Sequence, residues 1–483
     1  MKKIYLMYPQ KKGTIAPEIY GHFTEHIGGV IYDGIWVGKD SKIPNIKGFR
    51  KEIIEKMRAI KAPVIRWPGG CFAETYDWRD GIGENRPIRR NFWHFRDGRC
   101  ETNQVGTHEF MDFCELVGAD AYFAANITSV TPMHIRNWMD YCLSPKGTTS
   151  LAIEREMNGH PEPFKITYWG VGNENWGGGG NMPSDFYANE FRRFSTIMNY
   201  FCGLKNIELY ACGTDAFNYE WADGLMRNLR NSEKFMHGFA MHYYCGCAGD
   251  PVNFTNEEWS QLLVKAARME EIINRNWSII CGYGMEDHAK LVIDEWGCWH
   301  PEGSGPSRGE NLFEQQSTMR DAMVTALTLN IFNKHCDKIR MANVAQLVNN
   351  LHALFLARGE HCITTPTYHV FDMYKEHQGA ESIGVTVTDN EDFESSVTVS
   401  ASVKDNKTLI TIGNLSCTED SEIVLEAVGM DIPKTAEATL LYADDMHAHN
   451  TFESPENVIP VKTEVDISKP IIIPKTGILA IRF

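Results

Sequence analysis

The sequence predicts an α/β protein, in which a (β/α)8 TIM barrel is joined to a smaller C-terminal β-sandwich domain. From about residue 16 to 379, short apolar runs alternate with amphipathic segments. Parallel strands need such helical crossovers. After residue 379 the pattern changes to short alternating strands separated by turns, which is typical of a sandwich. Two glutamates also end apolar runs, where a barrel carries its active site.

The eight predicted barrel strands are short apolar runs. They are Tyr20–Phe23, Pro63–Trp67, Ala119–Ile127, Lys165–Gly172, Ile207–Gly213, Gly238–Tyr244, Leu291–Glu295 and Val344–Val348. The segments between them have a helical period. They include Arg50–Ile60, Thr107–Val117, Asp185–Phe201, Glu257–Asn274 and Glu310–Lys334. A doubly wound sheet would also give alternating units, and the position of the two glutamates favours the barrel.

The chain is predicted to divide into residues 1–15, 16–379 and 380–483, the last a jelly-roll-like sandwich. Its predicted strands are Ser395–Val403, Thr408–Ser416, Ser421–Leu425, Ala436–Tyr442 and Ile471–Phe483. The run Lys3–Met7 also has the character of a strand and precedes the barrel. We expect this N-terminal strand to pair into the C-terminal sandwich.

Composition excludes several classes of protein. The net charge of −16 argues against nucleic acid or an anionic membrane as the main partner. No stretch approaches the roughly 20 apolar residues of a membrane-spanning helix. Thirteen cysteines form no regular disulfide framework, and the N-terminus lacks the apolar core of a signal peptide. These features predict a cytoplasmic protein with reduced thiols.

The sequence predicts no metal and no cofactor. Neither His447 with His449 nor Cys245 with Cys247 has a complementary pair at zinc-finger spacing. The glycine run 177–180 lacks the Lys-Ser/Thr ending of a phosphate loop. A metal-dependent barrel hydrolase would need His and Asp at several strand ends, and only His242 is well placed.

Glu174 and Glu295 are the candidate catalytic residues. Glycosidic cleavage needs one carboxyl group to protonate the leaving oxygen and a second to attack the anomeric carbon or to activate water. Glu174 ends the apolar run of KITYWGVGNENWGGGG, and Glu295 ends that of KLVIDEWGCWH. Counted along the chain, they follow the fourth and seventh strands, so they can approach each other across the barrel mouth.

An Asn-Glu pair ending strand four and a Glu ending strand seven resemble the clan A retaining glycosidases. Within that clan the chain resembles the family 51 α-L-arabinofuranosidases along its whole length. The matching segments are IYGHFTEHIGGVIYDGIW, VIRWPGGCFAETYDWRDGIG, ETNQVGTHEF, YWGVGNENWGGGGNM, MHYY, VIDEWGCW, MANVAQLVN and HAHNTFESPENVIP.

The resemblance implies a role for each residue of the site. Glu174 would be the general acid/base and Glu295 the nucleophile. The residues implied to bind the sugar or to support the catalytic pair are Glu25, Arg66, Cys71, Asn173, His242, Tyr244, Trp299 and Gln346, with Trp93 on the leaving-group side. Arg66 would keep Glu295 ionised, since an adjacent cation stabilises the charged form. Asn173 would hold the sugar's 2-hydroxyl.

Cys71 departs from the pattern of many family members, which carry Asn after Pro-Gly-Gly. A thiol is a weak donor and a weak acceptor, so it cannot reproduce the paired hydrogen bonds of an amide. The substitution therefore bears on substrate preference.

The expected function is exo-acting hydrolysis of terminal α-L-arabinofuranosyl residues with retention. Arabinan, arabinoxylan and short oligosaccharides stay open as sources, and a cytoplasmic enzyme would favour imported oligosaccharides. The resemblance also implies a homo-oligomer, frequently a hexamer. A β-xylosidase or an endo-β-glucanase would share both carboxylates, and a sugar-binding protein without catalysis is a further alternative. The presence of both glutamates with Asn173 and Arg66 argues against that last alternative.

Overall fold

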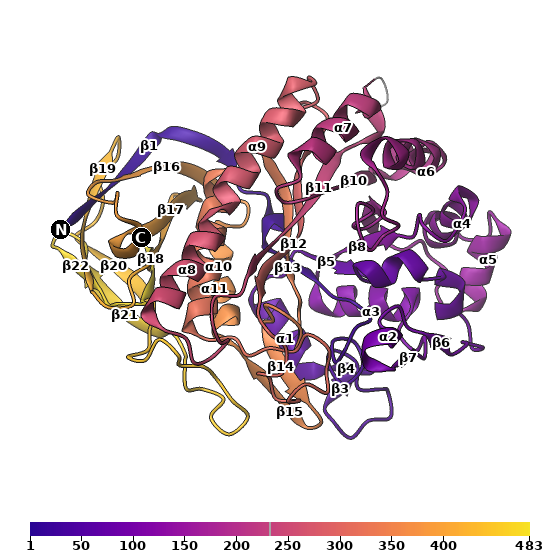
Figure 1. Cartoon of the computed structure of the whole chain (residues 1–483), viewed down its shortest axis with the longest axis horizontal. Helices are drawn as coiled ribbons and strands as arrows, with labels where there is room; N and C mark the ends of the chain where they lie inside the picture. Colours follow the sequence, from indigo (N-terminus) through magenta and orange to yellow (C-terminus); the bar gives the residue numbers. More distant parts are fainter. Residues whose placement is uncertain (231–232) are drawn as a thin grey trace. The chain divides into compact units, whose positions relative to one another are not determined.

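The computed structural model describes residues 1–230 and 233–483. Eight strands form a closed barrel in the order β10-β11-β12-β13-β2-β5-β8-β9 (Figure 1). The barrel strands are β2 (Gly21–Phe23), β5 (Val64–Trp67), β8 (Asp120–Ala125), β9 (Ile166–Val171), β10 (Glu208–Asp215), β11 (Gly238–Gly246), β12 (Lys290–Trp299) and β13 (Ile339–Ala345). The neighbouring pairs β2–β5, β5–β8, β8–β9, β9–β10 and β10–β11 are all parallel. The predicted barrel is confirmed.

Counted from β2 along the chain, β9 is the fourth barrel strand and β12 the seventh, as predicted. The predicted end of the seventh strand at Glu295 is wrong, because β12 continues to Trp299 and Glu295 lies inside it. The predicted position of the eighth strand, Val344–Val348, is wrong, because this strand spans Ile339–Ala345. Arg340 and Asn343 interrupt the apolar pattern at the true start of this strand, and the continuous apolar character begins only near its end. The residues after Ala345 are buried but form a loop.

Helices separate most of the barrel strands. They are α1 (Lys51–Ala59), α2 (His94–Asp97), α3 (Thr107–Val117), α4 (Pro132–Leu143), α5 (Ser150–Met157), α6 (Ser184–Lys205), α7 (Tyr219–Leu229), α8 (Asn256–Ala267), α9 (Met269–Gly282), α10 (Met319–Lys334) and α11 (Pro366–Tyr374). Turns of 3-10 helix cover Pro17–Tyr20, Cys71–Thr75, Trp78–Gly81, Glu233–Phe235, Lys375–His377 and Phe393–Ser395.

Two predicted helices differ from those observed. The segment Glu257–Asn274 is divided between α8 and α9 at Arg268, because the apolar period continues across the break and hides it. The segment predicted to start at Glu310 becomes helical only at Met319. Thr318 accepts a hydrogen bond from the Arg320 amide and Asp321 accepts one from the Thr318 amide, a capping box that fixes the start of α10.

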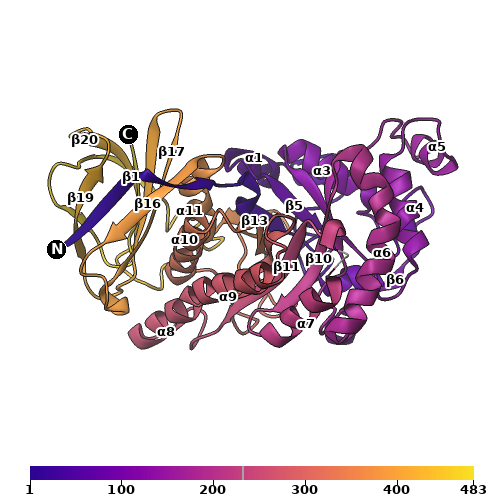
Figure 2. The same ribbon diagram turned by 90° about the horizontal axis from the view of Figure 1, so that it is seen from above.

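A nine-stranded sheet contains the C-terminal strands together with β1, in the order β21-β20-β23-β18-β17-β16-β1-β19-β22. Its strands are β1 (Lys2–Thr14), β16 (Glu381–Val387), β17 (Val397–Lys404), β18 (Lys407–Asn414), β19 (Ser421–Val428), β20 (Thr435–Leu441), β21 (Val461–Asp466), β22 (Ile471–Ile473) and β23 (Ile478–Arg482). β1 pairs antiparallel with β16 and parallel with β19. Figure 2 shows β1 running alongside β16.

Alternation of side chains explains the core of this sheet. Ile4, Leu6 and Tyr8 of β1 are buried in one hydrophobic cluster. Nearly all the other strands of the sheet contribute alternate residues to the same cluster, such as Ile410 and Ile412 of β18. One face of these strands therefore packs into a single core, as the inner faces of a β-sandwich do. The mostly-strand domain is therefore present as predicted, with the N-terminal strand in it.

Short antiparallel pairs lie in the loops: β3 (Asn45–Ile46) with β4 (Phe49–Arg50), β6 (Arg89–Arg90) with β7 (Cys100–Glu101), and β14 (Phe355–Arg358) with β15 (His361–Thr364). Close packing divides the chain into two compact units. Unit 1 comprises Met1–Tyr20, Tyr244–Ile273 and Trp296–Phe483, and unit 2 comprises Gly21–Tyr243 and Asn274–Glu295. The domain boundaries inferred from the sequence stay a prediction. Among the described helices, none combines the length and the apolar character needed to cross a membrane.

Candidate active site

Glu174 lies in a tight turn directly after β9. Gly172 has a φ of +91° and Glu174 has a φ of +44°, a left-handed conformation that non-glycine residues rarely adopt. The amides of Gly177 and Gly179 donate to the Glu174 carbonyl at 2.8 and 3.0 Å. The glycine run therefore fixes the backbone of Glu174, and strain of this kind gathers at functional sites.

A buried carboxylate, that of Glu74, holds this turn in place by hydrogen bonds. Its Oε1 accepts from the Asn173 amide at 2.6 Å and from Asn175 Nδ2 at 3.0 Å. Its Oε2 accepts from the amides of Ile127 and Thr128 at 2.9 and 3.0 Å. Burial raises the pKa of Glu74, and these four donors oppose that rise by stabilising the charged form. Glu74 thus couples the ends of β8 and β9.

Arg66, in β5, is fully buried and touches three groups of the site. Its Nη1 lies 2.7 Å from Glu295 Oε1, its Nη2 donates to Asn173 Oδ1 at 2.5 Å, and its Nε lies 3.5 Å from Asp294 Oδ2. Burial lowers the pKa of Arg66, but the charges of Asp294 and Glu295 outweigh it and raise the pKa above its ordinary value. Arg66 is therefore a fixed cation that stabilises ionised Glu295.

Asp294 lies next to Glu295 in the sequence and anchors Arg66. Tyr122 of β8 donates its hydroxyl to Asp294 Oδ2 at 2.8 Å. Burial raises the pKa of Asp294, although the Arg66 and His242 charges oppose the rise. The guanidinium of Arg66 also lies 4.6 Å from the ring centroid of Phe23. Asp294 and the Phe23 ring thus hold Arg66 in place, in addition to its contacts with Glu295 and Asn173.

His242, in β11, lies between the two candidate carboxylates. Its Nδ1 is 2.9 Å from Glu174 Oε1 and 3.6 Å from Glu295 Oε2. One atom from each of the three side chains lies within 4.8 Å of the other two. Burial lowers the pKa of His242, but the charges of Glu295 and Glu174 outweigh it and raise the pKa above 6.5. A protonated His242 would stabilise two carboxylates at this separation.

Cys71 contacts the proposed acid directly, at 3.6 Å from Sγ to Glu174 Oε2. A Cβ added at Gly178 would lie 2.7 Å from this sulfur, and one added at Gly70 would lie 2.9 Å from Glu295 Oε1. Both glycines therefore leave space for reactive side chains. Burial and the neighbouring carboxylates raise the pKa of the Cys71 thiol, so it stays protonated.

Glu25 and Trp93 form a second polar contact in the same unit. Glu25 Oε1 accepts from the Phe72 amide at 3.0 Å and from the Trp93 indole at 3.1 Å. Burial and the charge of Glu295 raise the pKa of Glu25 to about 7. Only a glycine fits at position 69, where a Cβ would lie 2.5 Å from Glu25 Cγ. The predicted binding residue Glu25 thus responds to the charge of the predicted nucleophile.

Asn173 has an unused donor. Its side chain is 2% exposed, and its Nδ2 has no hydrogen-bond partner among the residues that the structure describes. A Cβ built on Gly70 would lie 3.5 Å from this nitrogen. A buried amide donor usually has a partner, so Nδ2 is suited to a hydroxyl of a bound ligand.

Three predicted site residues belong to unit 1. Tyr244 is in β11, Trp299 is the last residue of β12, and Gln346 follows β13. The rings of Tyr244 and Trp299 meet edge to face with centroids 5.1 Å apart, and Trp299 also contacts Phe313 at 5.0 Å. Trp299 is 37% exposed and is not a core residue. Contact of these three residues with a sugar stays a prediction.

Sequence reasoning did not find Glu74, Asp294 and Tyr122. Asp294 could have been noticed, because it stands beside Glu295 in a buried strand where a charge requires a partner. Glu74 lies in CFAETYDW and Tyr122 in a plain apolar strand, so neither carries a local signal.

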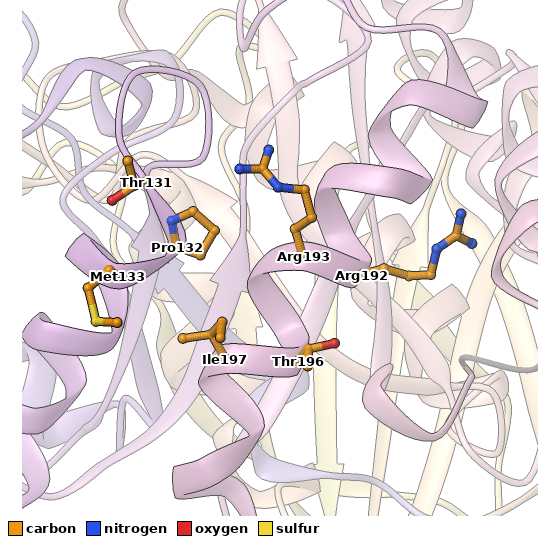
Figure 3. A pocket seen from close by; sticks show the side chains of 7 residues that line it. All are labelled: Thr131, Pro132, Met133, Arg192, Arg193, Thr196 and Ile197. Carbon is orange, nitrogen blue, oxygen red and sulfur yellow. The ribbon is translucent and has the colours of Figure 1, made fainter.

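A shallow surface depression of about 560 Å³ lies elsewhere in unit 2, between the start of α4 and the middle of α6. Its lining consists of Thr131, Pro132, Met133, Arg192, Arg193, Thr196 and Ile197 (Figure 3). It offers no carboxylate, histidine or thiol, so it lacks the groups needed for acid/base or nucleophilic catalysis.

Comparisons with known proteins identify the family. Residues 56–246 match the "Alpha-L-arabinofuranosidase 1 domain" and residues 294–473 the "Alpha-L-arabinofuranosidase C-terminal domain". A Bacteroides ovatus protein named "Intracellular exo-alpha-L-arabinofuranosidase" is 37% identical over 476 residues, which covers 95% of this chain and 90% of that protein.

Similar solved structures belong to the same family. The family 51 arabinofuranosidase of Xanthomonas axonopodis pv. citri is 36% identical, with a TM-score of 0.92 and complete coverage of both chains. The α-L-arabinofuranosidase of Thermotoga maritima, solved as an arabinose complex, is 27% identical with a TM-score of 0.87, again over both whole chains. The chain therefore belongs to the family 51 α-L-arabinofuranosidases, which are glycoside hydrolases.

Proposed function

We propose that the chain is a retaining, exo-acting α-L-arabinofuranosidase that removes terminal arabinofuranosyl residues by double displacement, with Glu174 as acid/base and Glu295 as nucleophile. The observation that carries this proposal is the approach of Glu174 and Glu295 oxygens to within 4.8 Å. Carboxyl groups of retaining enzymes lie about 5–5.5 Å apart, whereas inverting enzymes need about 6.5–9.5 Å to admit a water. The short separation supports direct attack by a carboxylate.

In the first step, an oxygen of ionised Glu295 bonds to the anomeric carbon while the glycosidic carbon–oxygen bond breaks. Protonated Glu174 gives its proton to the departing oxygen, which leaves as an alcohol. Arg66, 2.7 Å from Glu295, keeps the attacking group ionised beforehand. The product of this step is an arabinosyl ester of Glu295.

In the second step, water attacks the same carbon from the side that the leaving group vacated. Glu174, now a carboxylate, takes the proton of the water, and the ester bond to Glu295 breaks. His242, 2.9 Å from Glu174, stabilises this ionised state by its proximity. Two inversions give net retention and restore both glutamates.

Substrate recognition is proposed to involve Glu25, Asn173 and Cys71, with Tyr244, Trp299 and Gln346. The unused Nδ2 donor of Asn173 supports a contact with the sugar's 2-hydroxyl. Cys71 supplies only a weak donor beside Glu174, so it distinguishes this chain from relatives with an amide at that position. Short arabinose-containing oligosaccharides are the proposed substrates.

Two wider features complete the proposal. The Bacteroides ovatus relative is named as an intracellular enzyme, which supports a cytoplasmic location. A homo-oligomer, with a hexamer as the specific expectation, is implied by the family resemblance, and light scattering coupled to size-exclusion chromatography measures its mass.

The test of the mechanism is the stereochemistry of the first product. Proton NMR of early hydrolysis of 4-nitrophenyl α-L-arabinofuranoside should show α-arabinofuranose before mutarotation. First release of the β anomer would contradict double displacement. Parallel assays with 4-nitrophenyl β-xyloside and a β-glucan distinguish the alternatives. A faster rate on either one, or no turnover on any of the three, would overturn the assigned substrate.

A further inference from the structure

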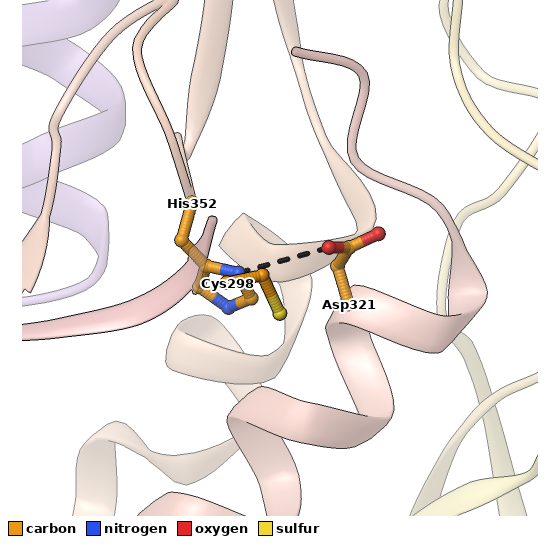
Figure 4. A group of neighbouring side chains, drawn as sticks. All are labelled: Cys298, Asp321 and His352. Carbon is orange, nitrogen blue, oxygen red and sulfur yellow. Dashed lines mark ion pairs between the residues drawn. The ribbon is translucent and has the colours of Figure 1, made fainter. Parts of the chain in front are cut away.

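A second group of chemically reactive side chains lies in unit 1, apart from the catalytic residues. Cys298 comes from β12, Asp321 from the first turn of α10, and His352 from the loop after β13. One ligand atom from each of the three lies within 4.8 Å of the other two, and none of these residues is measurably exposed. Figure 4 shows the three side chains converging, and we name them the Cys–Asp–His cluster.

The hydrogen bonds around His352 determine its tautomer, and therefore which ring nitrogen carries a lone pair. Thr325 donates its hydroxyl to the Asp321 carbonyl at 2.9 Å, so the same oxygen accepts from His352 Nε2 at 2.7 Å. The proton of a neutral ring is thereby placed on Nε2. Nδ1 then carries a lone pair, and it has no hydrogen-bond partner among the described residues.

This lone pair faces another acceptor. His352 Nδ1 is 3.8 Å from Asp321 Oδ1, which is too long for a hydrogen bond. Two buried acceptors that face each other without a proton between them are unfavourable unless a cation lies between them. The arrangement therefore calls for a positive charge at the centre of the cluster.

The separations fit two ligands of one tetrahedral metal ion. With metal–sulfur bonds of about 2.3 Å and metal–nitrogen or metal–oxygen bonds of about 2.0–2.2 Å, neighbouring ligand atoms lie about 3.3–3.8 Å apart. The nitrogen and oxygen of His352 and Asp321 are 3.8 Å apart. A second sulfur, Cys245 Sγ, lies 3.7 Å from Cys298 Sγ. Small side-chain movements would close the set.

The outer partners of the cluster are also those of a metal site. Asp321 Oδ2 accepts from the Thr318 amide at 2.8 Å, and Oδ1 lies 3.0 Å from His300 Nε2. His352 gives its other nitrogen to Thr325. Metal-bound histidines and carboxylates are oriented by such second hydrogen bonds.

We infer that Cys298, Asp321 and His352 bind a structural zinc ion, with Cys245 beside the open fourth position. Thiolate, imidazole and carboxylate together form the ligand set that zinc prefers. Binding would replace the thiol proton of Cys298, which is released to solvent, and the ion would enter as the chain folds. Sequence spacing did not reveal this site, because the three ligands are separated by 23 and 31 positions.

The test uses the whole protein expressed with zinc in the medium and dialysed against a weak chelator. Elemental mass spectrometry should find about one zinc per chain. Protein refolded with Co²⁺ alone should show a thiolate-to-cobalt charge-transfer band in the near ultraviolet. Zinc-edge X-ray absorption of the wild-type protein should show sulfur together with nitrogen or oxygen neighbours.

Variants locate the ion. Cys298→Ser and His352→Gln should each lower the zinc content at least tenfold, whereas Cys281→Ser, at an exposed cysteine outside the cluster, should retain it. Circular dichroism checks that each variant is folded. The inference is overturned if wild-type protein, folded with zinc or Co²⁺ in excess, holds less than a tenth of an equivalent. It is equally overturned if a folded Cys298→Ser protein keeps the full zinc content.

Discussion

Arg66 and Glu295 form a buried ion pair, with Nη1 2.7 Å from Oε1 and with the two side chains 0% and 8% exposed. Removing one partner of such a pair leaves an uncompensated charge, which costs about 3–5 kcal/mol. We therefore expect Arg66→Met to lower the free energy of unfolding by about that amount and to abolish measurable turnover. Urea denaturation and initial rates measure the two effects.

Arg89→Met is the matched control for this variant. Arg89 is 60% exposed and pairs with Asp80 at the surface. Its loss should leave the free energy of unfolding nearly unchanged, because exposed pairs contribute little. An Arg66→Met protein as stable and active as the control would show that the cation does not support Glu295.

Glu174→Gln tests the acid/base. The general acid contributes about 10²–10⁴-fold, and the contribution is largest when the leaving group is poor. We expect kcat/KM on an arabino-oligosaccharide, which reports the first step, to fall by about that factor, with a much smaller loss of kcat/KM for 2,4-dinitrophenyl arabinofuranoside, whose leaving group needs no proton. Added azide should rescue a Glu174→Ala variant and yield an arabinosyl azide, which mass spectrometry identifies. Equal losses on both substrates without rescue would contradict the role.

Glu74→Gln should displace the turn that carries Asn173 and Glu174. Each Glu74 oxygen accepts from two donors, so an amide in either orientation turns its NH2 towards two N–H groups. Unsatisfied buried donors cost about 1–3 kcal/mol. A shift of about 1 Å in Asn173 and Glu174 could lower kcat on the order of 100-fold. Glu55→Gln, at an exposed surface pair, is the control. A Glu74→Gln enzyme with wild-type kcat would refute this anchoring.

Gly178 and Cys71 are expected to be coupled through space. In Gly178→Ala the new methyl group would meet Cys71 Sγ at 2.7 Å and force the thiol away from Glu174. We expect kcat/KM to fall about tenfold, in line with coupling energies of about 0.5–3 kcal/mol between contacting residues. Cys71→Ala removes the sulfur and should recover most of this loss in the double variant. Strictly additive losses would argue against the contact.

Glu25 should make stability depend on pH. Its pKa is raised from 4.5 to about 7, so the native state holds the proton that the unfolded state releases first. The contribution of protonated Glu25 to stability is therefore complete below pH 4.5 and is lost as the pH rises through 7. At about 1.4 kcal/mol per pKa unit, the difference is on the order of 3 kcal/mol. The gap in unfolding free energy between wild type and Glu25→Gln, measured at pH 4.5 and pH 8, should change by that amount. An unchanged gap would contradict the raised pKa.

The fold was predictable because its information is local. The barrel strands and β1 are marked by short apolar runs, and the helices by a period that buries one face. Errors occurred where local patterns mislead. Arg340 and Asn343 hide the start of β13, and an unbroken apolar period hides the division of α8 from α9 at Arg268.

The sequence by itself determined the two candidate glutamates and the family, because each glutamate follows an apolar run of a predicted barrel strand and many motifs recur in order. It did not determine where the strands end, since Glu174 follows β9 whereas Glu295 lies inside β12. Tertiary structure alone decided what surrounds those glutamates. Glu74, Asp294 and Tyr122 act through hydrogen bonds to residues as many as 172 positions away in the sequence. The Cys–Asp–His cluster likewise exists only after three distant elements pack, because the chemistry of a buried group depends on its neighbours in space.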